Sequence, residues 1–233
     1  MFSMPIRNSL KNLRNTFDFS LRNKIALGLA VKKPLPIDLE FQTEMESFLN
    51  LFPWKDLLKG RAKTLKIADI GARNFALAPL WDRFFRKLGF EPEIHGIEID
   101  PNRRLTNLRT RGDYGRYYAQ SIPCGRYHTM DYLEWAEELD IAMHLNPFVT
   151  IDPLLAWGLP LKYFEPKSQF KHTQQLLSSR HGILVMSNPN IEEYQTAVGL
   201  ATEQGFTLRH EKPWRPRDQS SLKRSRFGSV FTF

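Results

Sequence analysis

Hydrophobic positions near the start of the chain follow the period of one helix face. Six of them, separated by four, three, four, four and four residues, are Ile6, Leu10, Leu13, Phe17, Leu21 and Ile25. This spacing predicts an amphipathic helix. Four basic residues lie off the stripe: Arg7, Lys11, Arg14 and Arg22. Such a helix is typical of a lid packed on the core, a membrane-surface anchor or an organelle-targeting segment; we expect the lid first.

A proline-containing linker follows this helix. Pro34 and Pro36 interrupt the pattern, because proline cannot continue a helix. Residues 38–59 again carry apolar residues at helical spacing and predict a second helix, broken near Pro53. We therefore expect an N-terminal helical extension over residues 1–60 and a second part over residues 61–233.

From Leu65 onward, short apolar runs alternate with helical patterns. The five runs are "LKIADIG", "EIHGIEID", "RYHTMDYLEW", "LDIAMHLNPFV" and "GILVMSNP". Five alternating strand–helix units predict an α/β fold with a doubly wound, mostly parallel sheet covered on both faces. The helix after the second run is expected to begin at Pro101, since proline is favoured in the first turn.

The end of the chain changes pattern. "TLRHEKPW" and "GSVFTF" both read as strands, and the loop between them is too short to hold a crossover helix. We therefore expect a C-terminal antiparallel strand pair.

Composition narrows the class of protein. A chain of 233 residues, 42% of them hydrophobic, is long enough to bury one sizeable core. A single cysteine, Cys124, excludes an intramolecular disulfide, and no apolar run approaches the ~18 residues of a spanning helix. These features favour a soluble cytoplasmic protein. Cys/His spacing typical of a metal site is absent from the sequence.

The net charge of +8 is unevenly distributed. Residues 1–33 carry +6 and residues 209–226 carry +5, so the rest of the chain is slightly acidic. Basic flanks suit an anionic partner, either nucleic acid or a membrane surface. The alternative is that both flanks are solvated and bind no partner.

Polar residues and glycine stand where the predicted strands end. Parallel sheets bind ligands beyond the carboxyl ends of their strands. The residues expected there are Asp69, Gly71, Glu98, Asp131 and Asn146.

Three features of this arrangement resemble the class I S-adenosylmethionine-dependent methyltransferases, over roughly residues 60–233. They are "ADIGARN", "GIEIDP" and the final strand pair. The resemblance implies that S-adenosylmethionine is the cofactor and that Glu98 accepts hydrogen bonds from its two ribose hydroxyls. It also implies that Asp131 lies near the adenine amine, with Asp69 and Gly71 beside the methionine moiety.

A nicotinamide dinucleotide is the competing ligand for such a loop. Its G-x-G-x-x-G pattern would need glycine at Arg73, and its acidic residue lies about 20 residues further on. Glu98 instead lies 27 residues beyond Gly71. The spacing therefore favours the methyl donor.

Arg73 stands where a second glycine was expected. A guanidinium can bind a carboxylate through two parallel hydrogen bonds, so we expect Arg73 to pair with the methionine carboxylate. Asn74 tolerates a positive φ and is expected to supply it in place of glycine. Alternatively, Arg73 binds a neighbouring acid or points to solvent.

The end of the fourth strand, "NPF", resembles the (D/N)-P-P-(Y/F/W) motif with which some of these methyltransferases act on amino nitrogens. The resemblance implies that Asn146 accepts hydrogen bonds from an amine and that Phe148 stacks on it; alternatively, they are a loop residue and a core residue. His144 is expected in the core, and His172 could be structural or functional.

Two functions remain open at this stage. The first is an S-adenosylmethionine-dependent methyltransferase whose acceptor is unknown, an amino nitrogen if Asn146 and Phe148 act as described. The second is a catalytically inactive binding or scaffold protein that contacts an anionic partner through its basic flanks.

Overall fold

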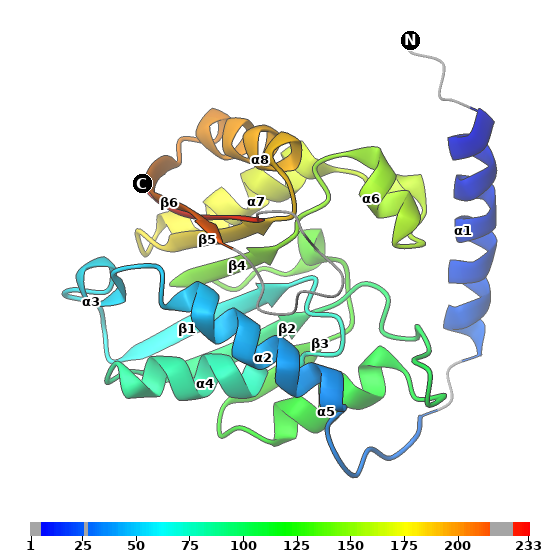
Figure 1. Ribbon diagram of the computed structural model, residues 1–233, viewed down its shortest axis with the longest axis horizontal. Helices are drawn as coiled ribbons and strands as arrows, with labels where there is room; N and C mark the ends of the chain where they lie inside the picture. The colour runs from blue at the N-terminus through cyan, green and yellow to red at the C-terminus, as the bar shows by residue number, and fades with distance from the viewer. Residues whose placement is uncertain (1–5, 26–27, 215–225) are drawn as a thin grey trace.

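A seven-stranded sheet forms the centre of the computed structural model, which describes residues 6–25, 28–214 and 226–233 (Figure 1). The strands are β1 (Thr64–Ile70), β2 (Glu91–Ile97), β3 (Gly125–His128), β4 (Ile141–Leu145), β5 (Ile183–Asn188), β6 (Thr207–Trp214) and β7 (Arg226–Thr232). Their order is β3-β2-β1-β4-β5-β7-β6. The first five strands pair in parallel, and β7 is antiparallel to both β5 and β6. The predicted doubly wound sheet and its C-terminal antiparallel pair are confirmed.

The register brings three strand ends to one edge of the sheet. Ile70, the last residue of β1, pairs with Ile97 of β2 and with His144 of β4. The loops that follow β1, β2 and β4 therefore begin at the same level. This is the edge at which doubly wound sheets bind ligands.

Helices cover both faces of the sheet (Figure 1). Those on one face are α2 (Pro36–Leu49), α4 (Ala78–Lys87) and α5 (Arg111–Gln120), and those on the other are α7 (Pro166–Ser178) and α8 (Ile191–Glu203). The remaining helical segments are α1 (Ile6–Lys24), α3 (Trp54–Leu57), η1 (Tyr132–Glu134), α6 (Ile151–Ala156) and η2 (Leu161–Tyr163). The second predicted helix is indeed interrupted, since α3 follows Pro53 as a separate turn.

Helix α2 shares its core with the sheet. Met45, Phe48 and Leu49 are almost fully buried and belong to the same apolar cluster as Leu65 and Ile67 of β1. The division of the chain into residues 1–60 and 61–233 stays a prediction.

The prediction that a helix begins at Pro101 is wrong, because α5 begins ten residues later, at Arg111. Thr110 has an extended backbone and forms a capping box with Asp113, in which each side chain accepts from the other's N–H at 2.9–3.1 Å. Residues 101–110 form a turn instead, closed by a bridge between Arg104 and Thr110. This turn carries basic side chains over the end of β2.

Helix α1 forms as predicted and packs on the body of the protein, but not through its apolar stripe. Its buried side chains are Asn15 and Phe19, on the opposite face of the helix. Ile6, Leu13 and Phe17 of the stripe are exposed. The helix therefore lies at the edge of the molecule on its polar face (Figure 1).

Candidate active site

A pocket of about 340 Å³ opens at the carboxyl ends of β1, β2 and β4. Its volume falls within the range of small-molecule sites. Six of the predicted site residues line it: Gly71, Arg73, Glu98, Asp131, Asn146 and Phe148. Asp69 and Asn74 line a smaller cavity of about 40 Å³ that shares Gly71 and Arg73 with it. The sheet topology thus gathers residues that lie up to 79 positions apart in the sequence.

The loop after β1 adopts a left-handed backbone at three alternate residues. The φ angles are 71° at Gly71, 56° at Arg73 and 58° at Phe75. The expectation that Asn74 supplies the positive φ is wrong, because its two neighbours do so. A left-handed conformation at a non-glycine residue costs about 1–3 kcal/mol and persists only where the surroundings impose it. The loop therefore keeps a backbone that glycines would adopt freely, although two of the three positions are not glycine.

Hydrogen bonds at each end hold this loop in place. The N–H of Gly71 donates to the carbonyl of Ile97 at 2.9 Å, and the N–H of Arg73 donates to Glu98 Oε2 at 2.7 Å. The hydroxyl of Tyr127 donates to the carbonyl of Arg73 at 2.6 Å. Both peptide groups of Arg73 are thus fixed by groups on β2 and β3, which stabilises its left-handed conformation.

Phe75 fills space that a glycine on β2 leaves open. Its ring is fully buried, and a Cβ added to Gly96 would lie 2.5 Å from Phe75 Cδ2. A larger residue at 96 would displace the ring, since no real Cβ contact is that short. Burial of a phenylalanine ring stabilises by about 1.5–3 kcal/mol, which offsets the strain at its backbone.

Asn74 anchors the loop to α2. Its Nδ2 lies 3.0 Å from both carboxylate oxygens of Asp38, which also accepts from the hydroxyl of Tyr118 at 2.8 Å. The side chain is only 8% exposed. Its amide nitrogen is committed to Asp38, and direct contact of Asn74 with a cofactor stays a prediction.

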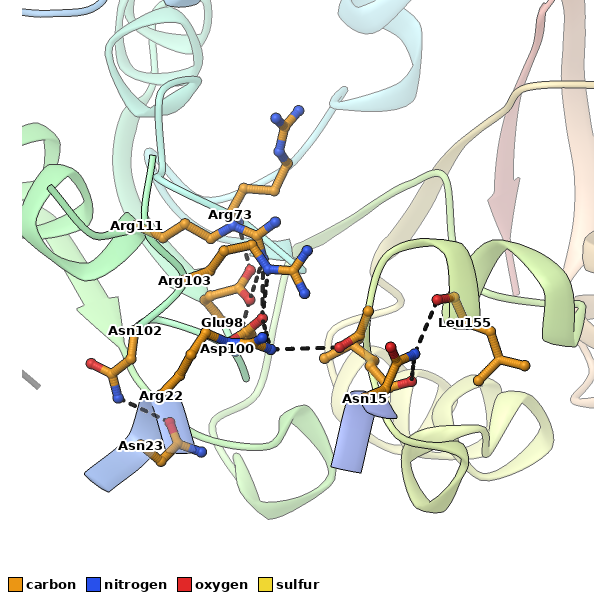
Figure 2. A network of polar contacts seen from close by, with 12 residues as sticks. Asn15, Arg22, Asn23, Arg73, Glu98, Asp100, Asn102, Arg103, Arg111 and Leu155 are labelled. Carbon is orange, nitrogen blue, oxygen red and sulfur yellow. Dashed lines mark hydrogen bonds and ion pairs between the residues drawn. The ribbon is translucent and has the colours of Figure 1, made fainter. Parts of the chain in front are cut away.

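Glu98 is buried at the end of β2 with most of its acceptor sites occupied (Figure 2). Its Oε1 accepts from the N–H of Asp100 at 2.8 Å and from Arg111 Nη1 at 3.3 Å, and its Oε2 accepts from the N–H of Arg73. Burial raises the pKa of Glu98, while Arg111 and the two N–H groups oppose this rise. A carboxylate offers about four acceptor sites. One site remains, enough for one ribose hydroxyl rather than the two expected from the sequence.

The guanidinium of Arg73 has no hydrogen-bond partner among residues 6–25, 28–214 and 226–233. Figure 2 shows it extending away from Glu98 and Asp100. It lies over the ring of Trp157 at 5.1 Å and near that of Phe41 at 6.0 Å, in the pocket wall. A hydrogen bond or ion pair of Arg73 with a neighbouring acid is not what the described residues show. Arg73 is exposed, so the alternative in which it points to solvent and its pairing with a carboxylate both stay predictions. Its five N–H donors are available to an anion in the pocket.

Arg111, Arg103 and Trp157 are residues that the sequence reasoning missed. The guanidinium groups of Arg111 and Arg103 lie 4.8 and 5.8 Å from the centre of the Trp157 ring. The only signal in the sequence was the density of arginines just after the second strand, and nothing linked these residues to a tryptophan 46 positions beyond Arg111. Three guanidinium groups, those of Arg73, Arg103 and Arg111, thus lie within 5.8 Å of the centre of the Trp157 ring, and of these residues Arg73 and Trp157 line the pocket.

The other three predicted contacts also line the pocket. Asp131 caps η1, where one carboxylate oxygen accepts from the N–H of Leu133 at 3.1 Å. Asn146 has a positive φ of 57°, and its Oδ1 is buried without a hydrogen-bond partner in the described ranges. The Phe148 ring lies 6.3 Å from that of Trp157. A buried acceptor that lacks a donor needs an explanation, and a ligand can supply one.

The two histidines near the site are structural. His144 is buried, its Nε2 lies 3.0 Å from Thr173 Oγ1, and burial lowers its pKa to about 3, so the predicted core role is confirmed. His172 Nε2 lies 2.7 Å from the carbonyl of Trp135, which fixes that nitrogen as the donor. Within the part of the chain that the structure describes, no cluster of His, Cys, Asp or Glu could hold a metal ion.

Asp69 should make stability depend on pH. It is buried, its carboxylate accepts from Trp81 Nε1 at 3.1 Å, and burial raises its pKa from 3.8 to about 7. Between these two values the folded protein keeps a proton that the unfolded chain releases, so stability falls as pH rises from about 4 to about 7. Asp69→Asn keeps an acceptor for Trp81 and should flatten this fall, measured by denaturant unfolding across that range.

Asp56→Asn, at an exposed position, is the matched control and should leave the pH profile unchanged. A profile for Asp69→Asn as steep as that of the unmodified protein would contradict the assignment.

Known structures show what this geometry resembles. The chain matches no protein-family model and no curated protein by sequence. By structure it is similar to magnesium protoporphyrin IX methyltransferase from Synechocystis PCC 6803 with bound S-adenosylmethionine, at 13% identity and a TM-score of 0.52, over 99% of both chains. A SAM-dependent methyltransferase from Methanosarcina mazei aligns with 78% of this chain and 97% of its own, at 11% identity and a TM-score of 0.51. The chain therefore has the fold of the class I S-adenosylmethionine-dependent methyltransferases.

Proposed function

We propose that this protein is an S-adenosylmethionine-dependent methyltransferase that binds its cofactor in the pocket at the ends of β1, β2 and β4. The observation that carries the proposal is the loop after β1. It keeps a left-handed backbone at Arg73 and Phe75 although both residues are strained there. Strain of this kind persists mainly at functional sites. The Synechocystis enzyme of the same fold was solved both with bound SAM and with bound SAH (S-adenosylhomocysteine).

The side chains in the pocket fit the three polar parts of this cofactor. The free acceptor site of Glu98 suits a ribose hydroxyl, and Asp131 suits the adenine amine. The guanidinium of Arg73, which has no hydrogen-bond partner among the residues that the structure describes, suits the methionine carboxylate, through charge-assisted hydrogen bonds. When bound, the cofactor supplies an electrophilic methyl group on its sulfonium.

An amino nitrogen is the acceptor that the pocket favours. The Oδ1 of Asn146 is a buried acceptor without a donor in the described ranges, and an amine N–H would satisfy it. Phe148 lies two residues further along the same wall and offers an aromatic face. Methyl transfer by in-line displacement depends mainly on the position of the acceptor relative to the methyl group. Asn146 and Phe148 would contribute to the rate by orienting the amine.

Arg73→Ala should weaken binding of the intact cofactor far more than binding of 5′-methylthioadenosine, which lacks the carboxylate. Hydrogen bonds to a charged group are worth about 1.5–3 kcal/mol, so the selective loss should be about 10- to 150-fold. Isothermal titration calorimetry with S-adenosylhomocysteine and with 5′-methylthioadenosine measures both affinities. Arg73→Lys should recover part of the loss, since it keeps the charge but not the planar fork.

Equal losses for the two ligands would mean that Arg73 shapes the loop without contacting the carboxylate. If neither ligand binds the unmodified protein, the scaffold alternative replaces the enzyme. In that alternative, the basic segments 1–33 and 209–226 contact nucleic acid or another anionic partner. Residues 215–225 lie outside the described residues, so that partner stays a prediction.

A further inference from the structure

Helix α1 presents a continuous apolar stripe to solvent. Its five residues lie at spacings of three or four and are Ile6, Leu10, Leu13, Phe17 and Leu21, with exposed fractions of 81, 63, 69, 67 and 44%. A soluble protein rarely exposes a contiguous patch of large apolar side chains unless the patch binds something. The stripe is therefore a candidate interaction surface.

The opposite face of α1 is anchored to the body of the protein. Asn15 Nδ2 donates to the carbonyls of Leu155 and Leu159, both at 3.0 Å (Figure 2). Phe19 is buried with its ring 5.2 Å from that of Tyr163, and Arg22 binds Asp100 through two nitrogens at 3.0 and 3.2 Å. Rolling the helix to bury its stripe would break all of these contacts. The contacts of Asn15, Phe19 and Arg22 on the opposite face of α1 therefore hold the stripe toward solvent.

Basic residues border the stripe. Helix α1 carries five basic residues and one acidic residue, a net charge of +4. Arg7 and Arg14 lie seven residues apart and, at 100° per residue, fall along one flank of the stripe, with Lys11 just behind them. Lys24 lies in line with the stripe at the end of the helix. Apolar side chains with cations along one flank match a surface with anionic headgroups over hydrocarbon.

A flat surface fits this helix better than a protein groove or a second copy does. A groove holds a helix on three sides, but the side of α1 away from the stripe is already packed on the protein. The exposed face of α1 carries five large apolar residues and a basic flank. A stable interface takes about 20–30 residues from each partner, so this face alone is too small to hold two copies together.

We propose that α1 docks this protein on the surface of anionic lipid membranes. The helix would lie in the plane of the headgroups with its stripe among the upper acyl carbons. No helix of the described ranges is long and apolar enough to cross a bilayer, so α1 lies on the membrane without spanning it. Leu159 and Tyr163, which contact α1, also line the pocket. Docking would hold the pocket beside the membrane.

Vesicle flotation tests this proposal directly. The full chain should bind vesicles of equal parts phosphatidylcholine and phosphatidylglycerol, and should bind phosphatidylcholine vesicles much more weakly. The double variant Leu13→Gln/Phe17→Gln should lower the partition coefficient on anionic vesicles by at least about tenfold, because it removes two large side chains from the stripe. Both residues are about two-thirds exposed, so the variant should fold normally, which circular dichroism checks.

The matched control is Leu39→Gln/Ile191→Gln, which changes two exposed apolar residues on α2 and α8 and should leave binding unchanged. The variant Arg7→Gln/Lys11→Gln/Arg14→Gln should lose binding to anionic vesicles while keeping the stripe.

Unchanged binding after loss of the stripe, no binding by the unmodified protein, or equal binding to both vesicle types would each overturn the proposal. So would a stable dimer in lipid-free ultracentrifugation that the Leu13/Phe17 variant dissociates, because the stripe would then join two copies. These results do not depend on the methyltransferase proposal, since no cofactor is present.

Discussion

Glu98→Ala is expected to lower the free energy of unfolding by about 3–5 kcal/mol and to weaken S-adenosylhomocysteine binding by about 10- to 150-fold. The first effect arises because Arg111, whose side chain is 5% exposed, would lose the nearer of its two buried partners and keep only Asp100 at 4.0 Å. The second arises because the variant would remove the proposed contact between Glu98 and a ribose hydroxyl of the cofactor. Denaturant unfolding measures the first effect and calorimetry the second.

A second variant separates these two roles. Glu98→Ala/Arg111→Met removes both buried charges and should recover part of the lost stability, since a buried pair costs most when one partner is left alone. Cofactor binding should stay weak. Glu91→Ala is the matched control, because Glu91 begins the strand that Glu98 follows, forms an exposed pair with Lys63 and should leave stability almost unchanged. Unchanged affinity in a folded double variant would contradict the ribose assignment.

The sheet was predictable from the sequence because its signals are local. Buried parallel strands read as short apolar runs, and the loop between the last two runs was too short for a crossover helix. The pocket residues at strand ends followed from the same logic, since parallel strands end at one edge. Glu98, Asp131 and Asn146 were found in this way and line the pocket.

The arginine cluster could not be predicted, because it depends on where the helix after β2 begins. Proline at position 101 is a good first-turn residue, but the capping box of Thr110 and Asp113 satisfies two N–H groups of α5 and places the helix start there. The preceding residues are then left in a turn that brings Arg103 toward Trp157. The spacing of Thr110 and Asp113 was a sequence signal for the later start, but nothing in the sequence ranked it above the start at Pro101.

Which face of α1 packs on the protein could not be predicted from the sequence either. Apolar residues at helical spacing indicate that one face of the helix is apolar, and such a face is usually buried against the core. The choice was decided by specific partners on the body: carbonyls for Asn15, an aromatic neighbour for Phe19 and a buried carboxylate for Arg22. The hydrophobic periodicity of α1 predicts that its polar face lies in solvent. Specific partners on the body of the protein can instead bind that face and leave the apolar face exposed.

Asp100→Ala should destabilise the protein by about 3–5 kcal/mol and loosen α1. Asp100 is fully buried and holds Arg22 at 3.0 Å and Arg103 at 2.8 Å, with Arg111 at 4.0 Å (Figure 2). Removing its carboxylate would leave several guanidinium groups close together without their shared anion, and a buried ion network is costly to break from one side. Denaturant unfolding measures the loss of stability, and limited proteolysis with trypsin reports exposure of Arg22 and Lys24.

Two further variants show which part of the effect belongs to α1. Arg22→Ala should also expose α1 to trypsin but cost less stability than Asp100→Ala, because Arg103 would still neutralise the buried carboxylate. Asp18→Ala, which breaks only the exposed pair with Arg14 on the same helix, should change stability by less than about 1 kcal/mol. If Asp100→Ala behaved like Asp18→Ala, Asp100 would not be the anchor that joins α1 to the end of β2. If Arg22→Ala left α1 protected from trypsin, Asn15 and Phe19 would be sufficient to hold the helix, and its outward stripe would not depend on the ion pair.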